Sequence, residues 1–180
     1  MKKFALLFSN IALFIALALL LAAGQTSFWL QVFGSFPAPA LWMPVLVYLA
    51  LFRSTMMMVA LSHLLAIALA SATAMPEALM MISCLAVALS VQVFKARIYW
   101  SATTYFMLVC GGATLAFHIF HFTSTWLLGD HPLTSPNLSS WIIQSLLTPL
   151  FAPLFFPVFR WIDHITERTE PPEISGAYSA

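Results

Sequence analysis

The stretch LLTPLFAPLFFPVFRWID, residues 146–163, is strongly apolar, yet it carries a proline at every fourth position: Pro149, Pro153 and Pro157. Proline inside a helix removes a hydrogen bond and clashes with the carbonyl four residues earlier. With 3.6 residues per turn, successive prolines lie about 40° apart and form one stripe. In lipid the freed carbonyls need partners. We therefore expect this proline stripe to pack against another helix, either of this chain or of a partner protein.

The composition of the whole chain indicates a membrane protein. Of 180 residues, 62% are hydrophobic and 7% are charged, and the mean hydropathy is +0.94. Soluble domains average about 25% charged residues. The charged residues here fall between apolar runs or at the chain ends, as expected where charge inside a bilayer is costly. The cysteines, Cys84 and Cys110, lie inside apolar runs without metal-ligand spacing, so they predict neither a disulfide framework nor a metal centre.

Apolar runs long enough to approach the roughly 20 residues that cross a bilayer occur six times. They cover residues 4–23, 38–52, 55–74, 77–94, 99–121 and 140–161. The second run is short and contains Pro44, which predicts a kink. The aromatic segment before it is expected to lie in the membrane interface. The predicted fold is all-α, with six transmembrane helices within residues 1–165 and a disordered tail over 166–180.

Lysine and arginine predict the orientation of these spans. If the N-terminus is cytoplasmic, the segments on that side hold all 7 Lys and Arg residues and the outer segments hold none. This separation follows the positive-inside rule and needs an even number of spans, with both termini in the cytoplasm. The first run begins like a signal peptide, but its apolar core exceeds the usual limit of about 15 residues. We therefore expect an uncleaved anchor.

Few ionisable residues fall inside the predicted spans. His63 is the deepest, and an ionisable residue at that depth is a functional candidate. No aspartate falls within a predicted span, so no relay of ionisable groups accompanies it. We expect neutral His63 to hydrogen-bond to Ser62, Ser71 or a carbonyl of a neighbouring helix.

A second polar group lies at the outer end of the fifth span. His118 and His121 are three residues apart, which is metal-ligand spacing, and Asp130 and His131 follow. No third ligand has a fixed spacing to the pair, so a zinc sphere is not favoured. We predict no catalytic residues, no metal site and no cofactor, and we expect that the protein is not an enzyme.

Small residues indicate where helices approach closely. In CGGATLA, residues 110–116, Gly112 and Ala116 lie four apart and Gly111 adjoins them, a spacing that brings helix backbones together. These three residues and the three prolines are the predicted helix-packing and partner-binding positions. Packing within the chain is the expected use of most of them, and the others are candidates to face a partner helix.

Together these features resemble the MreD family of bacterial rod-shape-determining membrane proteins. The resemblance rests on the six predicted spans, on PALWMPVLVYLALFR at residues 39–53, and on the final proline run followed by Arg160. The chain departs from the family pattern in one place. Where the family often has a Gly-Leu…Asp element after the second span, this sequence reads LSHLLAIALASATA, with His63 and no Gly or Asp.

The resemblance implies a non-enzymatic scaffold of the cell-elongation complex in the bacterial inner (cytoplasmic) membrane. Such a protein maintains rod shape by organising lateral peptidoglycan synthesis through transmembrane helix contacts. The implied partners are an MreC-like bitopic protein, an MreB-like actin filament, RodA and a class B penicillin-binding protein, with no nucleic acid. The alternative is the substrate-binding membrane subunit of a vitamin-type importer, which is similar in helix count.

Overall fold

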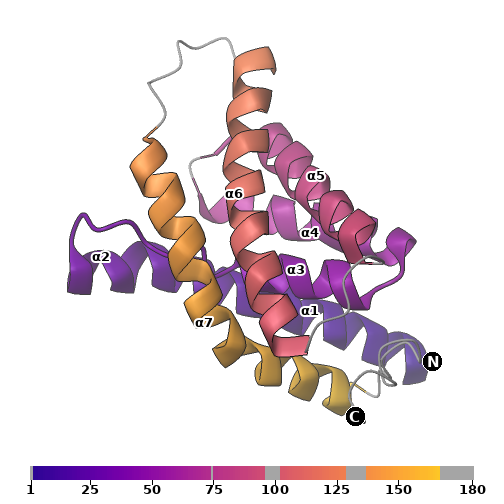
Figure 1. Ribbon diagram of the computed structural model, residues 1–180. Helices are drawn as coiled ribbons and strands as arrows, with labels where there is room; N and C mark the ends of the chain where they lie inside the picture. The colour runs from indigo at the N-terminus through magenta and orange to yellow at the C-terminus, as the bar shows by residue number, and fades with distance from the viewer. Residues whose placement is uncertain (1, 74, 96–101, 129–136, 167–180) are drawn as a thin grey trace.

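The computed structural model describes residues 2–73, 75–95, 102–128 and 137–166, and every regular element in these ranges is helical. The elements are α1 (Lys2–Ala23), the π-helical segment η1 (Gly24–Phe28), α2 (Trp29–Phe33), α3 (Met43–Phe52), α4 (Thr55–Ala72), α5 (Glu77–Lys95), α6 (Ala102–Leu128) and α7 (Leu138–Ile165) (Figure 1). Five stretches are long and apolar enough to cross a membrane: Leu6–Phe33, Thr55–Ala72, Glu77–Lys95, Thr103–Leu128 and Leu138–Ile165. The predicted all-α class is confirmed, and five of the six predicted spans correspond to these stretches. The predicted tail lies outside the described residues from position 167 onward.

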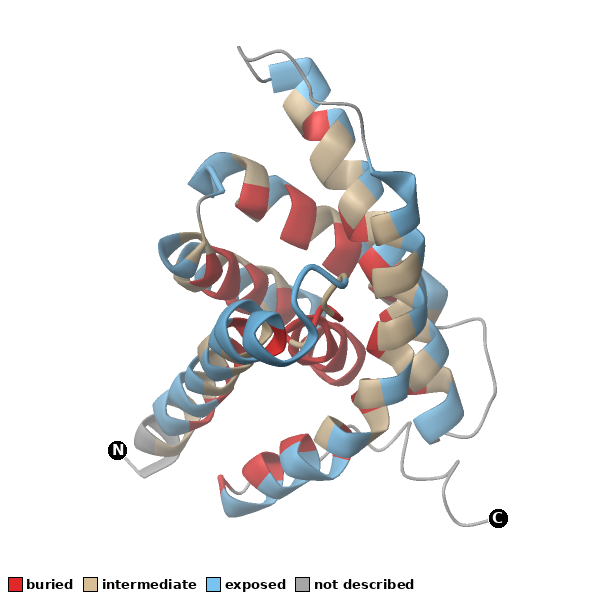
Figure 2. Cartoon of the chain, turned by 90° about the vertical axis from the view of Figure 1, so that its left-hand side faces the viewer, coloured by how far each residue is buried: buried red, intermediate tan, exposed pale blue. Residues whose placement is uncertain are grey.

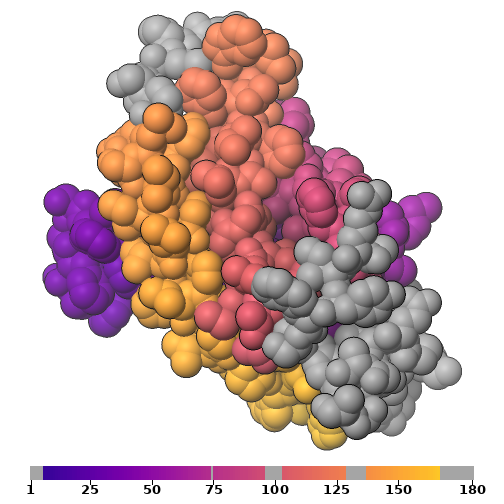
Figure 3. All heavy atoms as spheres, viewed as in Figure 1, coloured from indigo at the N-terminus to yellow at the C-terminus, as the bar shows by residue number. Residues whose placement is uncertain are grey.

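The first helix continues beyond its predicted end at residue 23. It passes through η1 and α2 without a break and ends at Gly34, whose φ of 60° and ψ of −128° suit glycine alone. The indole N–H of Trp29 donates to the Phe36 carbonyl at 3.0 Å, which holds the chain as it turns back. The segment expected to lie in the interface is thus helical as far as Phe33. Its α2 end projects past α7 at the left of Figure 3.

The short helix α3 lies at the centre of the molecule. All ten of its residues are buried, and Figure 2 shows buried residues gathered at the centre of the helix assembly. Helices α4, α5, α6 and α7 all contact it. Ten residues rise about 15 Å, half of a bilayer core of about 30 Å, so the prediction of a helix over 38–52 is wrong in length. The predicted kink at Pro44 is also wrong, because Pro44 lies in the first turn, where a missing N–H removes no helix bond.

The non-helical chain that leads into α3 is paired with α7. Thr148 Oγ1 accepts a hydrogen bond from the Ala40 N–H at 3.0 Å and donates one to the Gln144 carbonyl at 2.8 Å. Both Ala40 and Thr148 are buried. Irregular backbone at membrane depth is tolerated only where protein surrounds it and pairs its polar groups. Helix α7 therefore encloses the entry to α3.

Aromatic side chains fill the space among α1, α3 and α7. The ring centroids of Phe14, Tyr48 and Phe159 lie 5.0–5.9 Å from one another. Phe156 extends the cluster to Phe106 of α6, at 5.1 Å. Lipid tails are as apolar as these side chains, so helices in a bilayer are held together by packing contacts of this kind.

Helix α7 bends along its length. Pro149, Pro153 and Pro157 all lie inside it, and proline is the usual cause of a bend in a helix. In Figure 1 the first half of α7 runs beside α6, and the second half turns toward the start of α1. The bend lets one helix contact α6 and also reach α1.

Candidate functional site

The proline stripe and the small residues of α6 meet at one point. A methyl group built on Gly111 would lie 2.8 Å from Cγ of Pro149 and 3.0 Å from the carbonyl oxygen of Ser145. That carbonyl is the one freed by Pro149, four residues later. The backbone of α6 thus closes over it, and any side chain larger than glycine would be forced into α7. Gly111 and Pro149 are used in packing within the chain.

The rest of the proline stripe is less enclosed. Pro153 is half-buried and Pro157 is exposed. The fully buried face of α7 includes Thr148, Ala152 and Phe156, each one residue before a proline. One residue corresponds to about 100° around a helix, so the stripe lies beside the packed face and not on it. A helix covering Pro157 stays a prediction about a partner protein.

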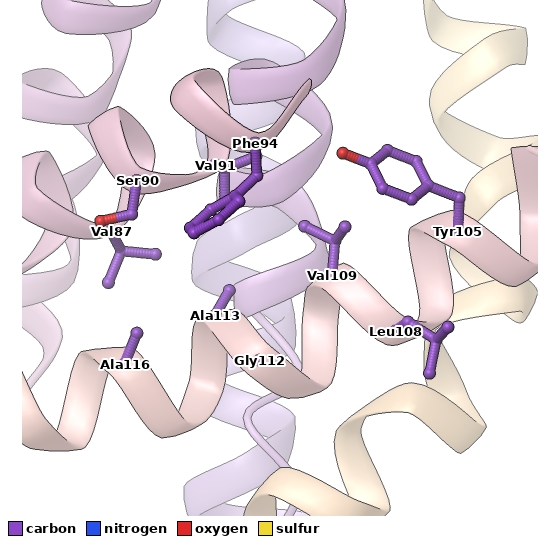
Figure 4. Close-up of a pocket in the computed structure, with 10 residues that line it drawn as sticks. All are labelled: Val87, Ser90, Val91, Phe94, Tyr105, Leu108, Val109, Gly112, Ala113 and Ala116. Carbon is purple, nitrogen blue, oxygen red and sulfur yellow. The ribbon is translucent and has the colours of Figure 1, made fainter. Parts of the chain in front are cut away.

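Gly112 and Ala116 lie in an open pocket between α5 and α6. The pocket has a volume of about 320 Å³, and Figure 4 shows the α5 side chains pointing toward α6 across it. Its lining residues are Val87, Ser90, Val91, Phe94, Tyr105, Leu108, Val109, Gly112, Ala113 and Ala116. Gly112 is exposed, and a methyl group built on it would meet nothing within 4 Å. The two adjacent glycines therefore differ: Gly111 is closed in by α7, whereas Gly112 leaves room for something outside the chain.

The pocket is lined mainly by carbon. The Ser90 hydroxyl donates to the Ala86 carbonyl of its own helix at 2.8 Å. The Tyr105 hydroxyl is buried and has no partner among the described residues. The pocket thus offers an apolar surface to an arriving molecule.

The strongest polar feature is a buried group that we call the ionic cluster: Asn10, Tyr48, Arg53, Asp163 and Thr166. Asp163 Oδ1 accepts from Arg53 Nη2 at 2.5 Å and from Asn10 Nδ2 at 2.9 Å. Its Oδ2 accepts from the Tyr48 hydroxyl at 2.8 Å. Asn10 Nδ2 also lies 2.8 Å from Thr166 Oγ1. Asp163 lies in the last turn of α7, two residues beyond the predicted end of the span at residue 161 and near the end of the apolar stretch Leu138–Ile165.

The ionic cluster is enclosed on all sides. No member is more than 6% exposed, and the Arg53 guanidinium lies 5.6 Å from the ring centroid of Phe14 and 5.9 Å from that of Tyr48. A buried charge is tolerated when it is paired and hydrogen-bonded. Because these groups are buried and join several helices, the cluster is suited to clamping the helices together.

The cluster joins helix segments that are distant in sequence. Asn10 belongs to the first half of α1, Arg53 follows α3, and Asp163 lies in the last turn of α7. Near the end of α5, Gln92 Nε2 donates to the carbonyls of Ala50 and Arg53 at 2.6 and 3.2 Å. The start of α1 and the ends of α3, α5 and α7 therefore gather on one side of the molecule.

His63 hydrogen-bonds within its own helix. Its Nδ1 lies 2.7 Å from the carbonyl oxygen of Val59 in α4. The predicted partners were different: Ser62 instead donates to the Val59 carbonyl at 2.9 Å and Ser71 to the Ala68 carbonyl at 2.7 Å. Hydroxyl and imidazole donors on a helix readily donate to a backbone carbonyl one turn earlier in the same helix, so they do not need an acceptor on a neighbouring helix.

The histidines of α6 pack against aromatic rings. His118 stacks on Trp141 of α7 with ring centroids 5.4 Å apart, and its buried Nε2 has no hydrogen-bond partner among the described residues. His121 stacks on Phe117 at 5.8 Å. Asp130 and His131 lie outside the described residues, and within the described part of the chain no three His, Cys, Asp or Glu side chains are grouped as metal ligands.

Sequence reasoning missed the ionic cluster because each member looks ordinary alone. Arg53 follows an apolar run as a surface anchor would, and Asn10 is one polar residue in a long span. The available signal was spacing: Asp163 lies four residues after Phe159 and seven after Phe156, on the face that α7 buries. No protein-family model, curated protein or solved structure matches this chain. The functional argument therefore depends on these residues.

Proposed function

We propose that this chain is a non-enzymatic scaffold of the bacterial cell-elongation complex that binds the transmembrane helices of its partners. The observation that carries the proposal is the open apolar pocket between α5 and α6, with exposed Gly112 in its wall. The resemblance to the MreD family supplies the biological setting. In that setting the partners are an MreC-like bitopic protein, RodA and a class B penicillin-binding protein in the inner membrane, with MreB-like filaments beneath it.

The pocket fits a partner helix in chemistry and in shape. An exposed glycine beside Ala116 lets a second backbone approach closely, which is how small residues act between helices in lipid. Phe94 and Leu108, both more than half exposed, form an apolar rim that a large side chain of the partner can contact.

The ionic cluster supports six crossings. Asn10 and Asp163 are in direct contact, so the start of α1 and the end of α7 lie at one level. An even number of crossings satisfies this contact if α3, together with residues 34–42, completes the second crossing. With six crossings, the distribution of Lys and Arg supports a cytoplasmic location for both termini.

The importer alternative needs a different kind of cavity. A site for a vitamin-sized molecule combines apolar walls with several convergent polar groups. The pocket described here has Ser90, whose hydroxyl is already bonded to its own helix, and Tyr105 as its polar side chains. This lining supports helix binding over recognition of a polar small molecule.

Depletion of the protein in the bacterium that carries it tests the proposal. If the chain is an elongation scaffold, depleted cells lose their rod shape and round or swell. Adding nutrients to the growth medium should not restore the shape. Cells that keep their shape but acquire a requirement for one nutrient would instead support the importer.

A further inference from the structure

His63 places a hydrogen-bond acceptor on the outer surface of α4. Because Nδ1 faces the carbonyl oxygen of Val59 at 2.7 Å, Nδ1 carries the proton and donates. In a neutral imidazole the other nitrogen, Nε2, is then an acceptor. The hydrogen bond within α4 thus fixes the tautomer.

Nε2 is open to the surroundings of the protein. It has no hydrogen-bond partner among the described residues, and it is not one of the buried atoms that lack a partner. The residues around it on the helix surface, Ala60, Leu64 and Ile67, are exposed. The acceptor therefore lies on the face of α4 that the other helices leave uncovered.

The depth of His63 makes an unpaired acceptor costly. It is the ninth residue of the 18-residue stretch Thr55–Ala72, so either end of α4 is about 12 Å away or more at 1.5 Å per residue. Water is absent from the middle of a bilayer, and a polar group there needs a protein partner. A lipid tail offers no donor.

We propose that His63 accepts a hydrogen bond from a partner protein's transmembrane helix, which carries a Ser, Thr, Asn or Gln side chain near its middle. Exposed Ala60, one turn away, allows that helix to approach closely. A second copy of this chain with its two-fold axis at His63 does not fit, since that contact would bring two acceptors together. The inference rests on the proposed scaffold function. It adds a second docking face, which binds through a hydrogen bond, whereas the α5–α6 pocket binds through apolar contacts.

Synthetic transmembrane peptides test this directly. The purified full chain, labelled with ¹⁵N-histidine, is reconstituted in phosphatidylcholine vesicles with a Leu/Ala peptide carrying one central Asn, or with the same peptide carrying Leu there. Peptide is kept dilute enough that it does not pair with itself. We expect the Asn peptide to bind about three- to thirtyfold more tightly, the range given by one hydrogen bond between membrane helices. The Nε2 resonance of His63 should shift with the Asn peptide and not with the Leu peptide.

Three variants complete the experiment. His63→Leu should remove the preference for Asn, His63→Gln should keep part of it because its amide oxygen accepts, and the neighbouring exposed control Leu64→Ala should keep all of it. An equal preference in the wild type and His63→Leu, no preference in the wild type, or an unmoved Nε2 resonance would overturn the proposal. The vesicles contain no elongation protein, so this result is independent of whether depleted cells change shape.

Discussion

Replacing Asp163 by Asn tests the clamp that holds the helices in place. The substitution keeps the size of the side chain and removes its charge. Arg53, which is 6% exposed, is then left in the protein interior without a counter-charge. Asn10 and Tyr48 lose the carboxylate to which they donate.

The expected loss is large. Removing one partner of a buried ion pair costs about 3–5 kcal/mol, because the remaining charge stays desolvated. Native proteins are stable by roughly 5–15 kcal/mol, so Asp163→Asn should remove a substantial fraction of the free energy of unfolding. Arg53→Met should cost a similar amount, since it leaves Asp163 charged and buried.

The double variant separates an ion pair from two independent residues. In Arg53→Met/Asp163→Asn no buried charge is unpaired, so its loss should be well below the sum of the two single losses. Reversible unfolding in bicelles, followed by far-ultraviolet circular dichroism, measures all three. His164→Asn, at an exposed neighbouring position, is the matched control and should change stability by no more than about 0.5 kcal/mol. Single losses under about 1 kcal/mol, or a double loss equal to their sum, would refute the clamp.

Three further predictions concern packing. Gly111→Ala should lower stability by about 1–3 kcal/mol by overpacking, whereas Gly112→Ala should be neutral or raise stability by up to about 1 kcal/mol. Thermal unfolding of the two variants measures this difference. Equal effects would contradict the finding that only Gly111 is closed in by α7. Thr148→Val should cost about 1–3 kcal/mol by leaving the backbone N–H before α3 unpaired, and Thr148→Ser should recover most of it in the same assay. Replacing Pro153 and Pro157 together by Ala should straighten α7 and lengthen the distance between spin labels at its two ends. An unchanged or shorter distance would show that the prolines do not set the bend.

The long helices could be predicted from the sequence because lipid leaves the backbone few choices. A run of about 20 apolar residues must satisfy its own backbone groups and becomes helical. The reasoning failed where protein replaces lipid as the surroundings. Helix α3 is half as long as a span, and the chain before it is not helical because Thr148 of α7 accepts a hydrogen bond from the Ala40 N–H. That contact cannot be predicted from a run of apolar residues.

The candidate site was predictable only in part. The small residues predicted that α6 packs closely against another helix. They did not predict that Gly111 faces Pro149 while Gly112 faces outward. The two glycines point in directions about 100° apart around the helix. The ionic cluster depends on contacts between residues more than a hundred positions apart, such as Asp163 and Arg53. Their distance in the sequence gives no sign that the two charges pair.

The central claim is that the α5–α6 pocket binds a partner helix. The most direct test is to replace the wild-type protein in the cell by the Gly112→Leu variant. Among the described residues, no atom beyond the local backbone of α6 lies within 4 Å of a methyl group placed at Gly112, so the variant should insert and fold while its side chain fills the pocket. The measurement is cell width and length when this variant is the sole copy, at native abundance in the membrane. We predict loss of rod shape; cells of normal dimensions would contradict the account.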